Sequence, residues 1–167
     1  MVENVIETPR LSLRALTLDE LRQIIDGSYP AIDPEAVTDS VRTAISKKII
    51  RMEMVDVALH PWYTYWLIGE RLSGIGIGFI GFKGFPGLNG CSEVGYGLSL
   101  NYRRRGLMTE ALRAMCDWAG SCSRCRGITA KIARSNVASQ AVVTHCHFQL
   151  AQGGAEELVF IHPFIRR

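Results

Sequence analysis

Three consecutive arginines followed by a glycine form the segment of this sequence with the clearest chemical potential. Arg103, Arg104, Arg105 and Gly106 lie between an apolar stretch and a run of apolar residues at helical spacing. The first N–H groups of a helix have no partner within it, and the helix dipole adds partial positive charge there. Glycine lets a ligand approach the backbone closely, and the arginines add a positive field. The segment predicts a site for an anion such as a pyrophosphate, with a solvated basic turn as the simpler alternative.

A strand before this turn and a helix after it are needed to hold such a site. Residues 92–100 are expected to form the strand, and residues 106–119 the helix. The helix carries apolar residues on one side, at Leu107, Ala111, Leu112, Met115 and Trp118. Because an apolar stripe of this kind packs against a core, it fixes the start of the helix relative to the sheet.

The rest of the pattern predicts an α/β (α+β) fold. Strands are expected at residues 10–16, 62–70, 75–82, 128–133, 148–152 and 157–161. A short helix is expected to begin at residue 18, and two further helices are expected over residues 33–52 and 137–146. Asp33 followed by Pro34 is a typical helix start, with an N-cap residue before a proline in the first turn. This order of elements indicates helices packed on a mixed sheet.

Length and composition indicate a single domain over residues 1–167. Of the 167 residues, 47% are hydrophobic and 21% are charged, and the net charge is +3. This charge is too small for a typical nucleic-acid-binding protein, and no apolar run approaches the roughly 20 residues that cross a bilayer. The acidic start and five cysteines without a regular spacing favour a cytoplasmic protein with reduced thiols.

Residues 103–108 also resemble the coenzyme A pyrophosphate loop of GNAT acetyltransferases. That loop has arginine or glutamine, two residues, glycine, one residue, and then glycine or alanine, so Met108 departs from the pattern and is expected to crowd the loop. Other segments are similar to the branch that acetylates the N-termini of ribosomal proteins, at residues 8–14, 65–68, 78–81, 109–111, 136–139 and 147–148. His147 stands where that branch has glycine and is expected to take a positive φ.

This resemblance covers nearly the whole chain and has implications for the fold and the co-substrate. It implies a mixed, mostly antiparallel sheet of about six or seven strands flanked by about four helices. It also implies acetyl-coenzyme A as co-substrate and no metal. The residues expected to contact the coenzyme are Leu98, Ser99, Arg103, Arg104, Arg105, Gly106, Leu107, Met108, Thr109, Asn136 and Ser139.

Two parts of this expected site need comment. In the family, the strand that matches residues 92–100 leaves its neighbour at a bulge, and the pantetheine arm pairs with the freed backbone groups, here near Leu98 and Ser99. Asn136 and Ser139 have a simpler interpretation, because both residue types favour helix N-caps.

The reaction implied by the resemblance is direct attack of a neutral primary amine on the thioester. Glu93 is the candidate base, since some family members carry a glutamate at a similar place, and an ordinary solvent-facing or ion-paired glutamate is the alternative. Many members protonate the leaving thiolate with a tyrosine whose position here is Val143. Ser139, His145 and Cys146 are possible substitutes, although a thiol with a pKa of about 8.5 does not require a dedicated acid.

The acceptor amine is the least determined part of this interpretation. The resemblance favours a protein N-terminus, with a small-molecule amine as the alternative, and it allows a homodimer. Because the tyrosine is missing, a GNAT-like domain that binds coenzyme A or a peptide without catalysis also stays open.

Two other functional classes fit the sequence less well. Residues 76–81 spell a dinucleotide-binding fingerprint, but the glycines lie inside a predicted strand and do not open a helix. Cys122, Cys125 and residues 145–147 resemble half of a zinc site, but a second clean pair of ligands is absent from the sequence.

Overall fold

One mixed sheet runs through the computed structural model, which describes residues 4–166. Its strand order is β1-β2-β3-β4-β5-β6-β8-β7, and all neighbours are antiparallel except β5 and β6, which are parallel. The strands are β1 (Val5–Glu7), β2 (Leu11–Ala15), β3 (Trp66–Glu70), β4 (Gly76–Phe82), β5 (Cys91–Leu98), β6 (Gly127–Ala133), β7 (Gln149–Gly153) and β8 (Glu157–Pro163). The expected α/β fold with a mostly antiparallel sheet is confirmed.

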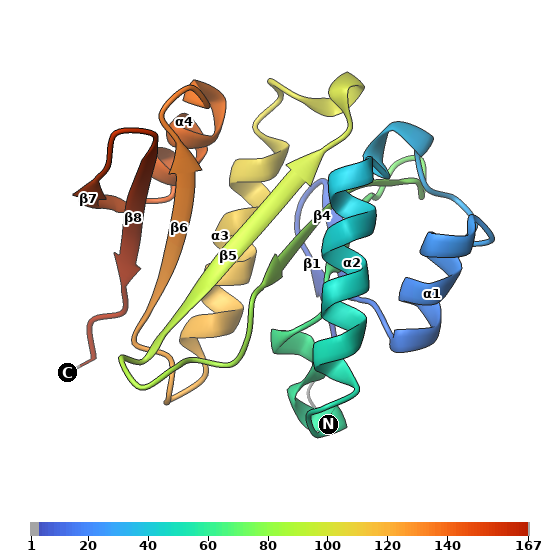
Figure 1. The fold of residues 1–167 in the computed structure, drawn as a ribbon. Coiled ribbons are helices and arrows are strands. Elements are labelled where there is room, and N and C mark those ends of the chain that lie inside the picture. Colours follow the sequence, from blue (N-terminus) through green and yellow to red (C-terminus); the bar gives the residue numbers. More distant parts are fainter. Residues whose placement is uncertain (1–3, 167) are drawn as a thin grey trace.

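Helices cover both faces of this sheet (Figure 1). The α-helices within residues 4–166 are α1 (Leu18–Asp26), α2 (Asp39–Met52), α3 (Leu107–Gly120) and α4 (Val137–His145). On one face α1 and α2 bury apolar side chains against Leu67 and Phe79 of the central strands. On the other face α3 packs against Trp66, Ile80 and Phe82, because side chains along a strand alternate between the faces.

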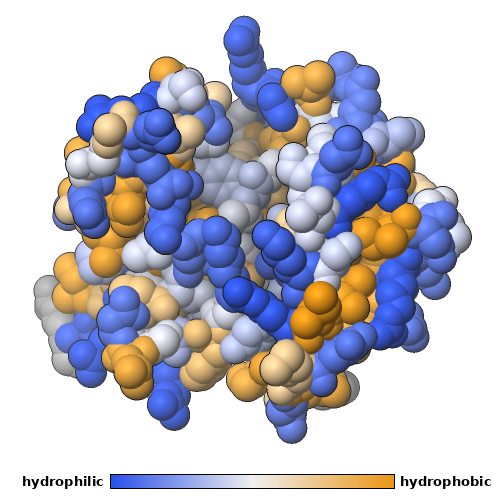
Figure 2. Space-filling model, viewed as in Figure 1, coloured by the Kyte–Doolittle hydropathy of each residue, from blue (hydrophilic) through white to orange (hydrophobic). Residues whose placement is uncertain are grey.

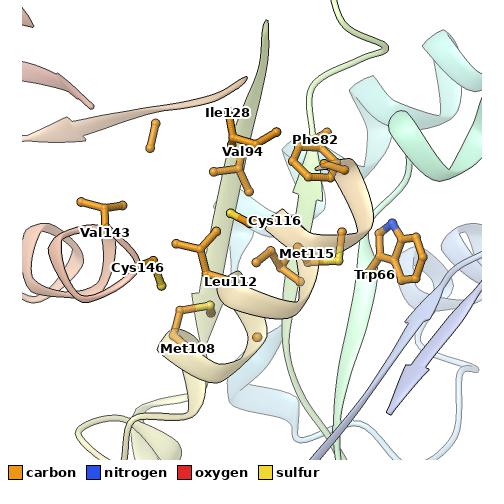
Figure 3. Close-up of a cluster of buried hydrophobic side chains, with 14 of the residues drawn as sticks. Trp66, Phe82, Val94, Met108, Leu112, Met115, Cys116, Ile128, Val143 and Cys146 are labelled. Carbon is orange, nitrogen blue, oxygen red and sulfur yellow. The ribbon is translucent and has the colours of Figure 1, made fainter. Parts of the chain in front are cut away.

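The inner stripe of α3 forms the centre of the larger core. Figure 3 shows Leu112, Met115 and Cys116 among side chains that come from the sheet, including Val94 and Ile128. All five of these side chains are buried. Burial of each large apolar side chain stabilises the fold by about 1.5–3 kcal/mol, so this contact holds the start of α3 in a fixed place.

Strands β5 and β6 pair over only part of their length. Their parallel pairing consists of Cys91 with Gly127, Ser92 with Ile128, and Glu93 with Thr129. Beyond these pairs β5 stays with β4 and β6 stays with β8, so the two strands diverge, as Figure 1 shows. The structure therefore contains a wedge-shaped gap inside the sheet.

The sequence predicted most elements within a few residues, and two expectations were wrong. The described residues contain eight strands, which agrees with the expected number of about six or seven except for the short edge strand β1 that pairs with β2. The segment at Asp33 forms only a 3₁₀ turn, Pro34–Ala36, and α2 begins later, where Thr38 caps the amide of Val41. Residues 57–62 are a 3₁₀ helix, so the strand expected from residue 62 begins only at Trp66.

The dinucleotide fingerprint lies within β4, and a loop follows it in place of a helix. Gly78 and Gly81 are required there for another reason. A Cβ atom at Gly78 would overlap the carbonyl of Gly97, and one at Gly81 would overlap the carbonyl of Thr64. None of the helices between residues 4 and 166 combines the length and apolar character needed to cross a membrane.

Candidate active site

A cavity of about 520 Å³ opens where the gap between β5 and β6 meets the starts of α3 and α4. On the face drawn in Figure 2 the surface is hollowed at the same place, between the upper parts of β5 and β6. The cavity is lined by Tyr96, Gly97, Leu98, Arg103, Arg104, Gly106, Leu107, Met108, Thr109, Asn136, Ala138, Ser139, Ala141, Val142 and His145. Most of the predicted coenzyme-binding residues are therefore brought together around one cavity.

The backbone of β5 presents alternate residues to this gap. Lys83 N–H donates to the Glu93 carbonyl at 2.9 Å, and Ser99 N–H donates to the Ile77 carbonyl at 2.8 Å, so these groups face β4. Because backbone groups alternate along a strand, those of Tyr96 and Leu98 face the gap.

Two details of the predicted strand geometry were wrong. The backbone N–H of Ser99 is not free, because it donates to the Ile77 carbonyl. The side-chain hydroxyl of Ser99 donates to Asp33 Oδ2 at 2.9 Å. The separation from β6 also needs no bulge, because β5 stays in register with β4 from Val94 to Leu98.

The start of α3 has the geometry of an anion site. Gly106 is the N-cap residue with φ +75° and provides no side-chain cap, and the N–H of Glu110 donates to its carbonyl at 3.1 Å. The amides of Leu107, Met108 and Thr109 precede the first intrahelical hydrogen bond and have no acceptor inside the helix. These three amides and the helix dipole can hold an anion in the cavity.

The three arginines differ in their positions. Arg103 and Arg104 line the cavity, and Nε of Arg103 donates to the Leu98 carbonyl at 3.1 Å. Arg105 is not among the lining residues, and its guanidinium lies over the ring of Tyr102 at 5.4 Å. Two of the three predicted cations are thus at the cavity.

The side chain of Met108 does not crowd the loop as the sequence suggested. It is only 7% exposed and points into the core beside Leu112 and Cys146 (Figure 3). The departure from the usual small residue is absorbed by core packing, and the amide of Met108 stays at the cavity.

The start of α4 is closed by its own cap. Oδ1 of Asn136 accepts the Ser139 N–H at 3.1 Å, which is the N-cap role considered from the sequence. At the other end of α4, His147 has φ +66°, and the amides of His147 and Phe148 bond to the carbonyls of Thr144 and Val143. This pattern is a Schellman motif, in which glycine is the usual residue at the His147 position.

Glu93 lies outside the cavity, on the other face of β5. Its side chain is 18% exposed and forms ion pairs with Lys83 and, at 3.5 Å, with Lys131. Glu93 is also the last residue of β5 that pairs with β6. In the structure Glu93 is therefore an ion-paired residue, which was the alternative to its role as a base. It lies at the closed end of the gap between β5 and β6.

Sequence reasoning missed Tyr96, whose side chain crosses from β5 to α4. Its hydroxyl donates to the Ser139 carbonyl at 3.3 Å, and burial raises its pKa to about 12. It is therefore a protonated donor at neutral pH. The two-residue period of a strand was the available signal, because Tyr96 and Leu98 must share both a face and an edge.

The substitutes for the missing tyrosine lie in different surroundings. Val143 is fully buried and is not among the cavity-lining residues, whereas Ser139 and His145 line the cavity. Cys146 is buried, with Sγ 3.5 Å from the Thr109 carbonyl, and burial raises its pKa to about 11. Its thiol therefore stays protonated at neutral pH.

The candidate zinc ligands near Cys122 and near Cys146 lie far apart in the structure. Cys146 lies beside Thr109 at the start of α3, whereas Cys122 and Cys125 follow the opposite end of that helix. Within residues 4–166, no three His, Cys, Asp or Glu side chains are close enough to share a metal ion.

Comparison with known proteins agrees with this geometry. Residues 10–149 match the model of a family described as "Acetyltransferase (GNAT) domain". The chain is 32% identical over 94 residues to "Uncharacterized N-acetyltransferase YjdG" of Bacillus subtilis (strain 168), and the match spans 56% of each protein.

Solved structures share the whole fold. The RimL ribosomal L7/L12 α-N-protein acetyltransferase in complex with coenzyme A has a TM-score of 0.68 at 17% identity, covering 96% of this chain and 98% of that one. A putative ribosomal-protein-serine acetyltransferase from Vibrio cholerae has a TM-score of 0.66 at 20% identity, with 98% and 99% covered. The microcin C7 self-immunity acetyltransferase MccE, in complex with acetyl-CoA and AMP, has a TM-score of 0.67 at 15% identity, with 93% of each chain covered. From the match over residues 10–149, the chain belongs to the GNAT acetyltransferase family.

Proposed function

We propose that this protein transfers the acetyl group of acetyl-coenzyme A to a primary amine. The observation that carries the proposal is the continuity of one cavity from an uncapped helix start to the edge of β5 beyond its last pair with β6, where the backbone of Tyr96 and the N–H of Leu98 face the gap and the Leu98 carbonyl accepts Nε of Arg103. Phosphates suit the amides of Leu107, Met108 and Thr109 and the side chains of Arg103 and Arg104. The amide-containing pantetheine arm suits the edge of β5 at Tyr96 and Leu98.

In the proposed reaction a neutral amine attacks the thioester carbon, a C–N bond forms, and the C–S bond breaks. The amine loses its proton to water or to Glu93 through water, and the sulfur leaves as a thiolate that is protonated to the free thiol. Tyr96 supplies a protonated hydroxyl on the cavity side of β5. When this hydroxyl turns its single hydrogen from the Ser139 carbonyl to the sulfur, the new hydrogen bond would stabilise the negative sulfur without complete proton transfer.

The acceptor proposed is a protein N-terminus or a small-molecule amine. An unperturbed α-amino group has a pKa of about 7.7–8.0, so a useful fraction is neutral near pH 7. Two of the structural neighbours are named as acetyltransferases of ribosomal proteins, which supports testing peptide N-termini first.

A thermal melt with acetyl-coenzyme A, with NAD as control, tests the proposed ligand. Ligand at 100 times its Kd stabilises a folded protein by about 2.7 kcal/mol, which shifts the midpoint measurably. A shift with acetyl-coenzyme A but not with NAD supports the site, and the absence of any shift contradicts it. Thiol release with a panel of peptides and amines then tests the transfer, and binding without release from any acceptor would favour a non-catalytic domain.

Glu93→Gln tests the proposed base. We expect a lower kcat with little change in the Kd of acetyl-coenzyme A, because Glu93 does not line the cavity. The pH profile of kcat should change in the variant. An unchanged kcat at every pH would show that Glu93 serves only in ion pairs with Lys83 and Lys131.

A further inference from the structure

Glu110 lies in the first turn of α3, and its carboxylate is bonded to a segment about 100 residues away in the sequence. Oε2 accepts the hydroxyl of Thr8 at 2.6 Å and the backbone N–H of Arg10 at 2.9 Å. Oε1 accepts Nε of Arg10 at 2.8 Å. These contacts bind the loop before β2 to the helix start that carries the anion site.

The guanidinium of Arg10 makes a second contact, to the basic turn itself. Its Nη1 donates to the carbonyl of Arg105 at 2.8 Å. In a trans peptide the carbonyl and the following N–H point in opposite directions, and the described residues contain no cis peptide. The N–H of Gly106 is therefore directed away from Arg10.

Arg10 and the proposed anion site lie on opposite sides of Gly106. Arg10 and Glu110 line a separate groove of about 730 Å³ on the outer side of α3, and neither lines the cavity. Gly106 lines both. The N–H of Gly106 is therefore directed away from the groove, and because Gly106 also borders the cavity, this amide is placed to add to those of Leu107 and Met108.

The charge of Glu110 would by itself oppose a bound anion, because it lies one turn from the anion site. Burial raises the pKa of this carboxyl, but the hydrogen bonds from Thr8 and Arg10 outweigh burial and lower the pKa below its usual value. The negative charge is thus matched by the guanidinium of Arg10, which stays between the carboxylate and the basic turn.

We propose that Arg10 and Glu110 are positioning residues that fix the Arg105–Gly106 peptide with its N–H toward the phosphates of acetyl-coenzyme A. The inference deepens the proposed function and rests on it. Arg10 acts through the backbone of the loop, and Glu110 acts by orienting Arg10.

Removal of this contact should weaken binding of the phosphates specifically. For Arg10→Ala we expect the Kd of acetyl-coenzyme A to rise about tenfold, because one charge-supported backbone contact at the ligand is lost. The Kd of S-acetylpantetheine, which lacks the phosphates, should stay within about twofold, as should kcat at saturating acetyl-coenzyme A. Arg10→Lys is the milder variant. It keeps the charge, but lysine lacks the planar fork that reaches both Glu110 and the Arg105 carbonyl, so most of the loss should remain.

Arg71→Ala is the matched control. Nη1 of Arg71 donates to the Thr8 carbonyl at 2.8 Å, and Nε pairs with Glu7 at 3.2 Å, so Arg71 holds the same loop without touching the basic turn. Its Kd for acetyl-coenzyme A should equal that of the wild type.

The Kd values are measured by calorimetry on the full chain, and a melt without ligand confirms that each variant is folded. An unchanged Kd in Arg10→Ala, an equal loss for both ligands, or an equal loss in Arg71→Ala overturns the inference and leaves the proposed function intact. A wild-type protein that binds no acetyl-coenzyme A overturns both.

Discussion

The two helices that begin at the cavity start in opposite ways. At α4 the side chain of Asn136 occupies the amide of Ser139, and at α3 the cap is Gly106, which has no side chain to offer. The helices away from the cavity follow α4, since α1 and α2 are capped by Thr17 and Thr38. A side-chain cap stabilises a helix by about 1 kcal/mol. Because α3 has no such cap, it lacks this stabilisation, and its first amides have no side-chain acceptor in the ligand-free protein. The difference supports the proposal that the amides of α3 bind the phosphates of the ligand, whereas the start of α4 only lines the cavity.

The largest expected effect comes from placing the same acid at both helix starts. Gly106→Asp strains a backbone held at φ +75° and places a carboxylate beside the Arg10 guanidinium, whose Nη2 lies 3.5 Å from the new Cβ, so the basic turn is disturbed and we expect the Kd of acetyl-coenzyme A to rise roughly 100-fold. Asn136→Asp keeps a capping carboxylate at α4 and should raise the Kd less than about fivefold. Calorimetry on both variants makes the comparison, and equal losses would show that the two helix starts play the same role.

Tyr96→Phe tests whether the Tyr96 hydroxyl, which bonds to the start of α4, stabilises the reacting sulfur. We expect kcat to fall about tenfold with little change in the Kd of acetyl-coenzyme A, since one hydrogen bond to developing charge is lost. The pKa of Tyr96 is raised to about 12, so the hydroxyl is protonated throughout pH 6–9. The ratio of wild-type to variant kcat should therefore be constant over that range. A ratio that changes with pH, or an unaltered kcat, would exclude this role.

Asn136→Ala should act mainly on stability. We expect loss of about 1 kcal/mol in the free energy of unfolding, because the Ser139 amide loses its side-chain acceptor. Denaturant unfolding of the ligand-free protein measures this loss, and Thr38→Ala at α2 is the control for an ordinary cap far from the cavity. If Asn136 contacts the coenzyme in addition, added acetyl-coenzyme A will stabilise Asn136→Ala less than it stabilises Thr38→Ala.

The smallest effect is expected at the far end of α4. His147→Gly should raise the free energy of unfolding by about 1 kcal/mol or less, because glycine adopts φ +66° without the steric cost that other residues have there. The Kd of acetyl-coenzyme A should not change, since His147 does not line the cavity. A destabilised variant would mean that the histidine side chain makes a compensating contact in solution.

Local signals in the sequence predicted the parts of the site that depend on neighbouring residues. The glycine after three arginines located the start of α3, and the apolar stripe of that helix identified its buried face. Contacts between distant residues could not be predicted in the same way. Three such contacts depend on which strands become neighbours. They are the ion pair of Glu93 with Lys131, the hydrogen bond from Ser99 to Asp33, and the hydrogen bond from Arg10 to the Arg105 carbonyl.

Competition between adjacent signals explains the errors in the fold. Asp33 and Thr38 are both good N-cap residues, and each caps a nearby amide in the structure. Only Thr38 begins a long helix, because the backbone of Asp33 is bonded to the Gly76 carbonyl of the sheet. The sequence contains both signals, but tertiary pairing decides between them.

The short junction between β5 and β6 has a mechanical consequence. Three residue pairs join the section β1–β5 to the section β6–β8, and α3 is the main element that spans both. Opening at this seam breaks few backbone bonds, so amide hydrogens of β5 and β6 near the seam should exchange with deuterated solvent sooner than those between β3 and β4. A molecule bound across the gap would slow that exchange, and the cooperativity of unfolding would then depend on its concentration.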